Sequence, residues 1–137
     1  MKPKSIPGPR QRELIMAALD VISKARAEGE TLTFREVTRR ALLRQPSMYY
    51  ISVTTAVNRL SRMRRGHRVF ESELTARQYE EINEQVNKVL AKRPTLNFSG
   101  AVNFVLSYMR PSRFYISEDT ASRIIRPFTM FHGFAGA

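Results

Sequence analysis

Two pairs of matching segments recur in the same order along this chain of 137 residues. TLTF at 31–34 matches TLNF at 95–98 with an offset of 64 residues. PSMYYISVTTA at 46–56 matches PSRFYISEDTA at 111–121 with an offset of 65 residues. Because the order and the spacing both repeat, the sequence predicts a duplicated unit of about 50 residues. The chain must therefore fold around one plan of elements used twice.

Each repeat contains three stretches with the apolar spacing of an α-helix. The predicted helices are 12–28, 34–44 and 53–65 in the first repeat, and 76–92, 99–109 and 118–126 in the second. Pro127 is expected to stop the last helix. We therefore predict an all-α fold, which leaves room for very short extended segments at 48–51 and 113–116.

Polar residues at the predicted helix starts support these boundaries. Thr33 and Thr75 each precede a Glu or Gln by three residues, the spacing of a capping box. Ser52 and Ser117 stand directly before the third helix of each repeat. The predicted organisation has four parts: a flexible basic arm (1–10), a first three-helix unit (11–70), a second three-helix unit (71–126) and an apolar, aromatic tail (127–137).

Positive charge is concentrated in the first half of the chain. The formal net charge is +11. Residues 1–70 hold 15 Lys and Arg against 5 Asp and Glu, whereas residues 71–137 hold 8 against 7. A one-sided excess of this kind indicates a surface for a polyanion, although a solvated basic face without a partner is the alternative.

The second and third helices of the first repeat follow the general plan of a divergent helix-turn-helix reader. Their connection, 45–52, is longer than the usual turn of three or four residues. Arg, Asn and Thr are suited to reading base edges, and further arginines to contacting phosphates. The predicted nucleic-acid-binding residues are Arg35, Arg39, Arg40, Arg44, Thr55, Asn58, Arg59, Arg62, Arg64, Arg65 and Arg68.

The second repeat lacks this chemistry. Ser99 and Asn103 stand where the first repeat has Arg35 and Arg39, and Glu118 stands where it has Val53. Acidic residues at a helix start suit the helix dipole but repel phosphate. We expect the second repeat to serve packing or self-association.

Two other features have competing interpretations. The aromatic residues Tyr49, Tyr50, Phe114 and Tyr115 can stack on unpaired bases, but their presence in both repeats favours packing in the core. The cluster RMRRGHR at 62–68 can clamp phosphates or be a solvated helix end; the charge of this half favours the clamp.

The sequence offers little for catalysis. It has no cysteine, no glycine-rich phosphate loop, and no GxSxG or HExxH motif. His67 and His132 have no neighbours that suggest a metal site. We expect a non-enzymatic protein without metal or cofactor, and without a membrane-spanning segment, in the cytoplasm.

The favoured function is DNA binding through the basic helices of the first repeat, in a regulatory or architectural role. RNA binding within a ribonucleoprotein is one alternative. A structural or protein-interaction module of a phage or mobile-element assembly is another. A homodimer through the second unit or the tail is compatible with each of them.

Overall fold

A computed structural model describes residues 7–68, 70 and 72–129, and this part of the chain is built from helices. They are α1 (Pro9–Ala27), α2 (Phe34–Leu42), α3 (Val53–Arg64), α4 (Glu73–Lys92), α5 (Phe98–Tyr108) and α6 (Glu118–Thr129). No residue within the described ranges forms a strand, so the prediction of an all-α fold is confirmed and 48–51 and 113–116 are irregular. The predicted arm and tail lie largely outside these ranges.

Side-chain caps fix the starts of the third helices. The Ser52 hydroxyl accepts a hydrogen bond from the Thr55 amide at 3.2 Å, and Ser117 does the same for Thr120 at 3.2 Å. Thr33 caps α2 by accepting from the Glu36 amide at 3.1 Å. These caps agree with the predictions because capping depends on residues within one turn.

Three predicted boundaries are wrong by three residues or more. Helix α1 begins at Pro9 rather than at residue 12, so Pro9 and Arg10 of the predicted arm are helical. Helix α4 begins at Glu73 because Ser72, one turn before Thr75, supplies the cap. Pro127 lies inside α6 rather than ending it. Phe128 and Thr129 follow it in the described part of the helix, and the fully buried Thr129 donates a hydrogen bond to the Ile125 carbonyl. The helix continues past the proline because packing of this last turn outweighs the missing amide hydrogen bond.

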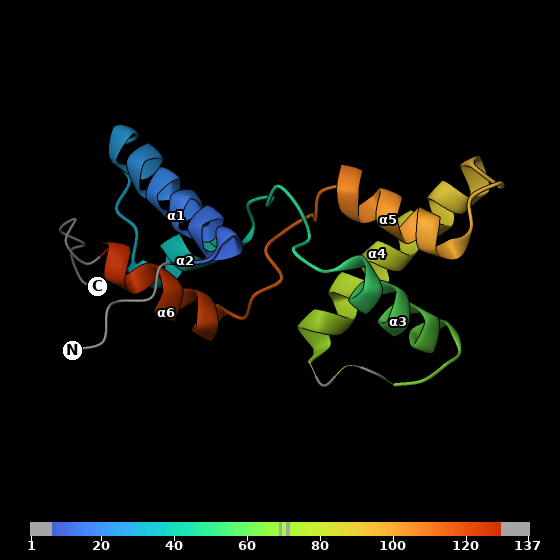
Figure 1. Ribbon diagram of the computed structural model, residues 1–137. Helices are drawn as coiled ribbons and strands as arrows, with labels where there is room; N and C mark the ends of the chain where they lie inside the picture. The colour runs from blue at the N-terminus through green and yellow to red at the C-terminus, as the bar shows by residue number, and fades with distance from the viewer. Residues whose placement is uncertain (1–6, 69, 71, 130–137) are drawn as a thin grey trace. The chain divides into compact units, whose positions relative to one another are not determined.

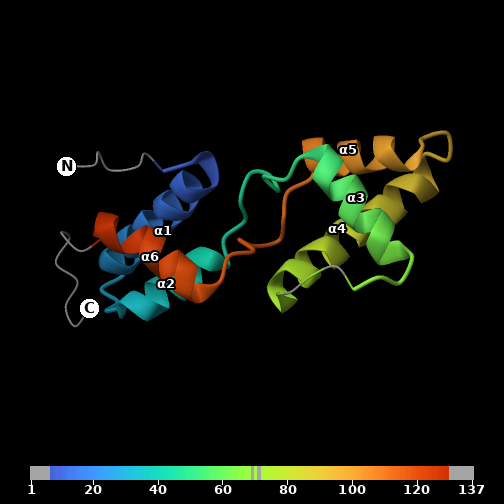
Figure 2. The ribbon, with the colours of Figure 1, turned by 60° about the horizontal axis from the view of Figure 1, so that its bottom comes forward.

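The helices form two compact units that cut across the repeats. The continuous unit, 47–111, contains α3, α4 and α5. The discontinuous unit, 1–46 with 112–137, contains α1, α2 and α6. Helix α3 packs on α4 and α5, while α6 packs on α1 and α2, as both ribbon views show (Figures 1 and 2). The third helix of each repeat therefore packs on the first two helices of the other repeat.

This arrangement differs from the predicted tandem units, 11–70 and 71–126. Helices α2 and α3, the two predicted helices of a helix-turn-helix, belong to different compact units. The net charge is also divided differently when residues are grouped by compact unit instead of by half of the sequence. The discontinuous unit holds 13 Lys and Arg against 7 Asp and Glu, a net +6, and the continuous unit holds 10 against 5, a net +5. Each compact unit is basic.

Each unit has its own apolar core. In the discontinuous unit, α6 contributes Ala121 and Ile125, both fully buried. In the continuous unit, α3 contributes Ala56 and Leu60, also fully buried. The irregular segment before each third helix adds one aromatic ring: Tyr49 and Phe114 are each 2% exposed. The interpretation as core residues is confirmed for these two rings, whereas Tyr50 and Tyr115 are half-buried.

Candidate nucleic-acid interface

The structure divides the predicted nucleic-acid-binding residues between the two compact units. Arg35, Arg39, Arg40 and Arg44 lie on or directly after α2 in the discontinuous unit. The others lie on α3 and the turn after it in the continuous unit: Thr55, Asn58, Arg59, Arg62, Arg64, Arg65 and Arg68. These two groups have different electrostatic surroundings.

Glu118, at the start of α6, binds two arginines of α2. The Nε atom of Arg35 lies 3.0 Å from one carboxylate oxygen, and the Nε atom of Arg39 lies 3.1 Å from the other. The hydrogen bond from Arg39, supported by the one from Arg35, lowers the pKa of Glu118. The acidic start of α6 therefore faces α2, and a phosphate approaching these arginines would have to compete with a carboxylate.

The other two arginines of this group are also paired. Arg40 Nη1 lies 2.5 Å from Glu30, and this hydrogen bond raises the pKa of Arg40. Arg44 Nη1 lies 2.7 Å from Asp20, and this hydrogen bond is the main cause of the lowered pKa of Asp20. All four arginines remain partly exposed, but much of their charge is neutralised within the unit.

Helix α3 presents a polar face to solvent and an apolar face to the core. Ala56 and Leu60 are fully buried, and Val53, Val57 and Met63 pack against the same cluster. All seven predicted residues of this group are exposed, on α3 or in the turn after it: Thr55, Asn58, Arg59, Arg62, Arg64, Arg65 and Arg68. Both faces agree with the predicted amphipathic pattern.

Contacts made by the α3 arginines hold their side chains without neutralising them. Arg64 donates a hydrogen bond to the Asn83 side-chain oxygen at 2.7 Å and lies over the Phe98 ring at 4.9 Å. Arg59 lies 5.7 Å from the centre of the Tyr79 ring. Asn83, Phe98 and Tyr79 come from α4 and α5, so the sequence of α3 contains no signal that would have identified them.

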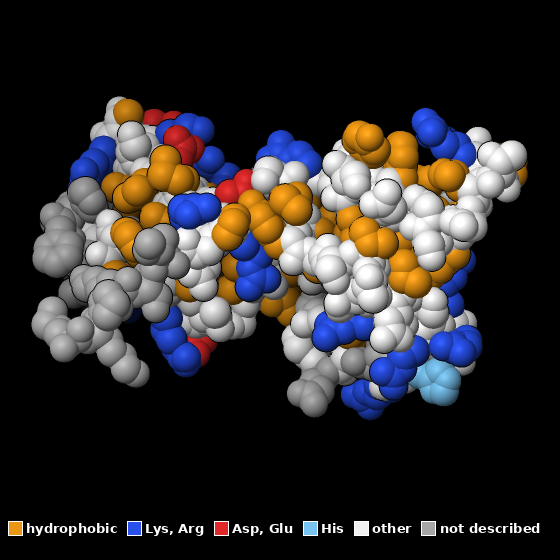
Figure 3. Space-filling view, in the orientation of Figure 1, with side chains coloured by type: hydrophobic (Ala, Val, Ile, Leu, Met, Phe, Trp, Pro, Cys, Tyr) orange, Lys and Arg blue, Asp and Glu red, His pale blue; other side chains and the backbone are white. Residues whose placement is uncertain are grey.

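Positive charge is uncompensated around the end of α3. Arg59, Arg62, Arg64, Arg65 and Arg68 have no Asp or Glu within 4.0 Å among the residues that the structure describes. Lys and Arg side chains gather at the lower right of the space-filling view (Figure 3). Together with exposed Thr55 and Asn58, this surface combines groups suited to phosphates and to base edges. We call these seven residues the α3 surface.

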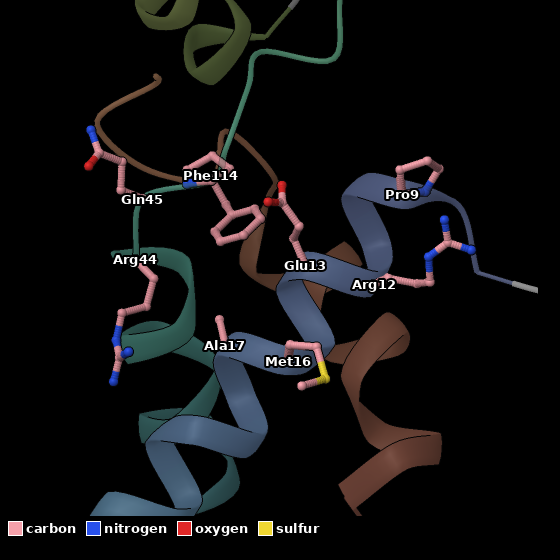
Figure 4. A pocket seen from close by; sticks show the side chains of 9 residues that line it. Pro9, Arg12, Glu13, Met16, Ala17, Arg44, Gln45 and Phe114 are labelled. Atoms are coloured by element: carbon pink, nitrogen blue, oxygen red, sulfur yellow. The ribbon is translucent and has the colours of Figure 1, made fainter. Parts of the chain in front are cut away.

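A pocket on the discontinuous unit is lined by Arg12, Met16, Ala17, Arg44 and Phe114, among others, with no cluster of catalytic groups (Figure 4). The described ranges contain no group of three or more acidic or histidine residues placed to hold a metal ion. No helix in them is long and apolar enough to cross a membrane.

Comparisons with protein-family models, curated proteins and solved structures give no significant match for this chain.

Proposed function

We propose that this protein is a non-enzymatic DNA-binding protein that contacts duplex DNA through the α3 surface. One observation supports this proposal most directly: five exposed arginines of α3 and its following turn lack carboxylate partners in the described part of the chain, whereas the four arginines on or directly after α2 are paired. Cations of this kind can replace the counterions condensed on a nucleic acid.

The chemistry of α3 favours duplex DNA over RNA. An α-helix fits the major groove of B-form DNA, whereas the major groove of an RNA duplex is too narrow and deep to be read. Asn58 can pair with adenine and Arg62 with guanine, while the Thr55 methyl can contact thymine. Of the four aromatic rings expected to favour RNA, Tyr49 and Phe114 are buried, whereas Tyr50 and Tyr115 are half-buried.

We infer that the two repeats arose by duplication and that α3 acts as the reading helix of a divergent helix-turn-helix. The support for duplication is the equivalence of roles, since Ser52 and Ser117 cap, and Leu60 and Ile125 fill cores, at a constant offset of 65. In this reading α5 supports α3 in place of α2, because α3 packs on α5.

The test is DNA affinity as a function of salt concentration, measured by fluorescence anisotropy with a labelled duplex. The variant combines Arg62→Ala with Arg65→Ala. We expect weaker binding and a reduction of the salt slope by about one for each lost phosphate contact. Competition with duplex RNA and single strands distinguishes the favoured ligand from the RNA alternative.

A matched control removes the same charge from the same unit. Arg77→Ala with Lys88→Ala deletes two exposed cations of α4, each paired with a glutamate one turn earlier. We expect this control to retain nearly all of the wild-type salt slope. If both variants lose the same affinity, binding follows total charge and not the α3 surface. Negligible binding to every nucleic acid would favour a protein-interaction module.

A further inference from the structure

Segments 46–64 and 111–129 each contain the third helix of a repeat and the irregular stretch before it. They present the same apolar pattern to the pair of helices on which each segment packs, and we call that pair of helices its seat. Each supplies one aromatic ring, one alanine and one branched aliphatic residue to a core at matching positions: Tyr49, Ala56 and Leu60 in one, and Phe114, Ala121 and Ile125 in the other. Each seat consists of the first two helices of the opposite repeat. Apolar packing alone therefore discriminates weakly between the two possible occupants.

An ion-pair contact distinguishes the seats at the start of the third helix. In the discontinuous unit Glu118 binds Arg35 and Arg39 at 3.0 and 3.1 Å. At the matching positions of the continuous unit, Val53 replaces the glutamate. Ser99 and Asn103 replace the two arginines there, so the acidic residue and its cations occur in the same seat although they come from different repeats.

A second polar contact distinguishes the seats at the aromatic ring. In the continuous unit the Tyr49 hydroxyl donates a hydrogen bond to Glu81 at 3.1 Å. In the discontinuous unit Phe114, which has no hydroxyl, takes the place of the tyrosine. Ala17, at the offset of 64 from Glu81, lines the same pocket as Phe114, whose ring is directed toward α1 (Figure 4). Donor and acceptor are thus both present in one seat and both missing from the other.

We propose that these two contacts determine which third helix occupies which seat, so that each repeat donates its third helix to the other. If each segment packed on its own repeat, Glu118 would face Ser99 and Asn103, and Tyr49 would face Ala17. Arg35 and Arg39 would lose their carboxylate, and Glu81 would lose its donor. The role of Arg35 and Arg39 is therefore to select the third helix that packs on α1 and α2, whereas the proposed role of the α3 arginines is to contact DNA.

The test exchanges the determinants between the two segments of the full chain. The variant combines Tyr49→Phe, Val53→Glu, Phe114→Tyr and Glu118→Val. The readout is nuclear Overhauser contact between arginine side chains and phenylalanine rings. In the wild type, Arg126 lies over Phe34 at 4.4 Å and Arg64 over Phe98 at 4.9 Å.

In the variant we expect Arg64 to contact Phe34 and Arg126 to contact Phe98. The population ratio of the two arrangements should shift by about tenfold or more, because two polar contacts then favour the unexchanged form. The control variant combines Met48→Arg, Arg113→Met, Thr54→Asp and Asp119→Thr. It exchanges other differences between the same segments and should retain the wild-type contacts.

A folded variant that keeps the wild-type contacts would overturn the proposal. If the variant does not fold, a double-mutant cycle decides the question. Glu118→Gln should lower the urea midpoint of the wild-type chain but leave it nearly unchanged after Arg35→Ala and Arg39→Ala. An equal loss in both backgrounds would show that the arginines do not act with Glu118, and would overturn the proposal as well.

Discussion

At the scale of single residues, Glu118 joins two helices that are distant in sequence. Its carboxylate receives hydrogen bonds from Arg35 and Arg39 across 83 and 79 positions of chain. These bonds favour the charged carboxylate, which is why the pKa of Glu118 is lowered. The folded state therefore binds a proton at Glu118 less readily than the unfolded state does.

This difference predicts the pH dependence of stability. The contribution of Glu118 to the free energy of unfolding is fully present at pH values above the pKa of an unfolded glutamate, about 4.3. It is lost as pH falls through the lower pKa of the folded state, because the unfolded chain then binds more protons. Urea unfolding midpoints between about pH 3 and pH 6 should fall more steeply in the wild type than in Glu118→Gln. Parallel curves would contradict this prediction.

At the scale of elements, α3 and α6 each complete a core formed with the first two helices of the other repeat. Helix α3 packs on α4 and α5, and α6 packs on α1 and α2. Leu60 and Ile125 are both fully buried, in the continuous and the discontinuous unit respectively. Truncating either side chain should leave a cavity in one core and not in the other.

Leu60→Ala and Ile125→Ala should each destabilise their unit by about 2–5 kcal/mol. Amide hydrogen exchange measured by NMR can assign the effect to helices. Leu60→Ala should accelerate exchange in α4 and α5, and Ile125→Ala in α1 and α2. Acceleration in α1 and α2 caused by Leu60→Ala would instead mean that α3 packs within its own repeat.

The elements were predictable where neighbouring residues determine them. The caps Ser52 and Ser117 and the apolar faces of α3 follow from local spacing. The choice of packing partner was not predictable from that spacing, because Ala56 with Leu60 and Ala121 with Ile125 offer nearly the same surface. The same limit applies to the candidate site. The arginines near α2 and those near α3 look alike in the sequence. Only the folded positions of Glu118, Glu30 and Asp20 separate the paired arginines from the uncompensated ones.

At the scale of the whole molecule, the continuous unit is an insertion between α2 and α6 of the discontinuous unit. It contains the complete α3 surface and the core that supports it. Chains of this size can fold alone. Residues 47–111 should therefore show a cooperative thermal transition by circular dichroism. Residues 65–111, which lack α3 and Tyr49, should show none, and a cooperative transition there would contradict the assigned core.

The insertion also has a mechanical consequence. Helices α1 and α6 are the first and last helices among the described residues, and they pack against each other. A pulling force applied to the chain at the start of α1 and the end of the described part of α6 therefore loads the interface between these helices before it reaches α3, α4 and α5. Under tension the discontinuous unit has to open first, and the helices that carry the α3 surface remain shielded from the load until it has done so.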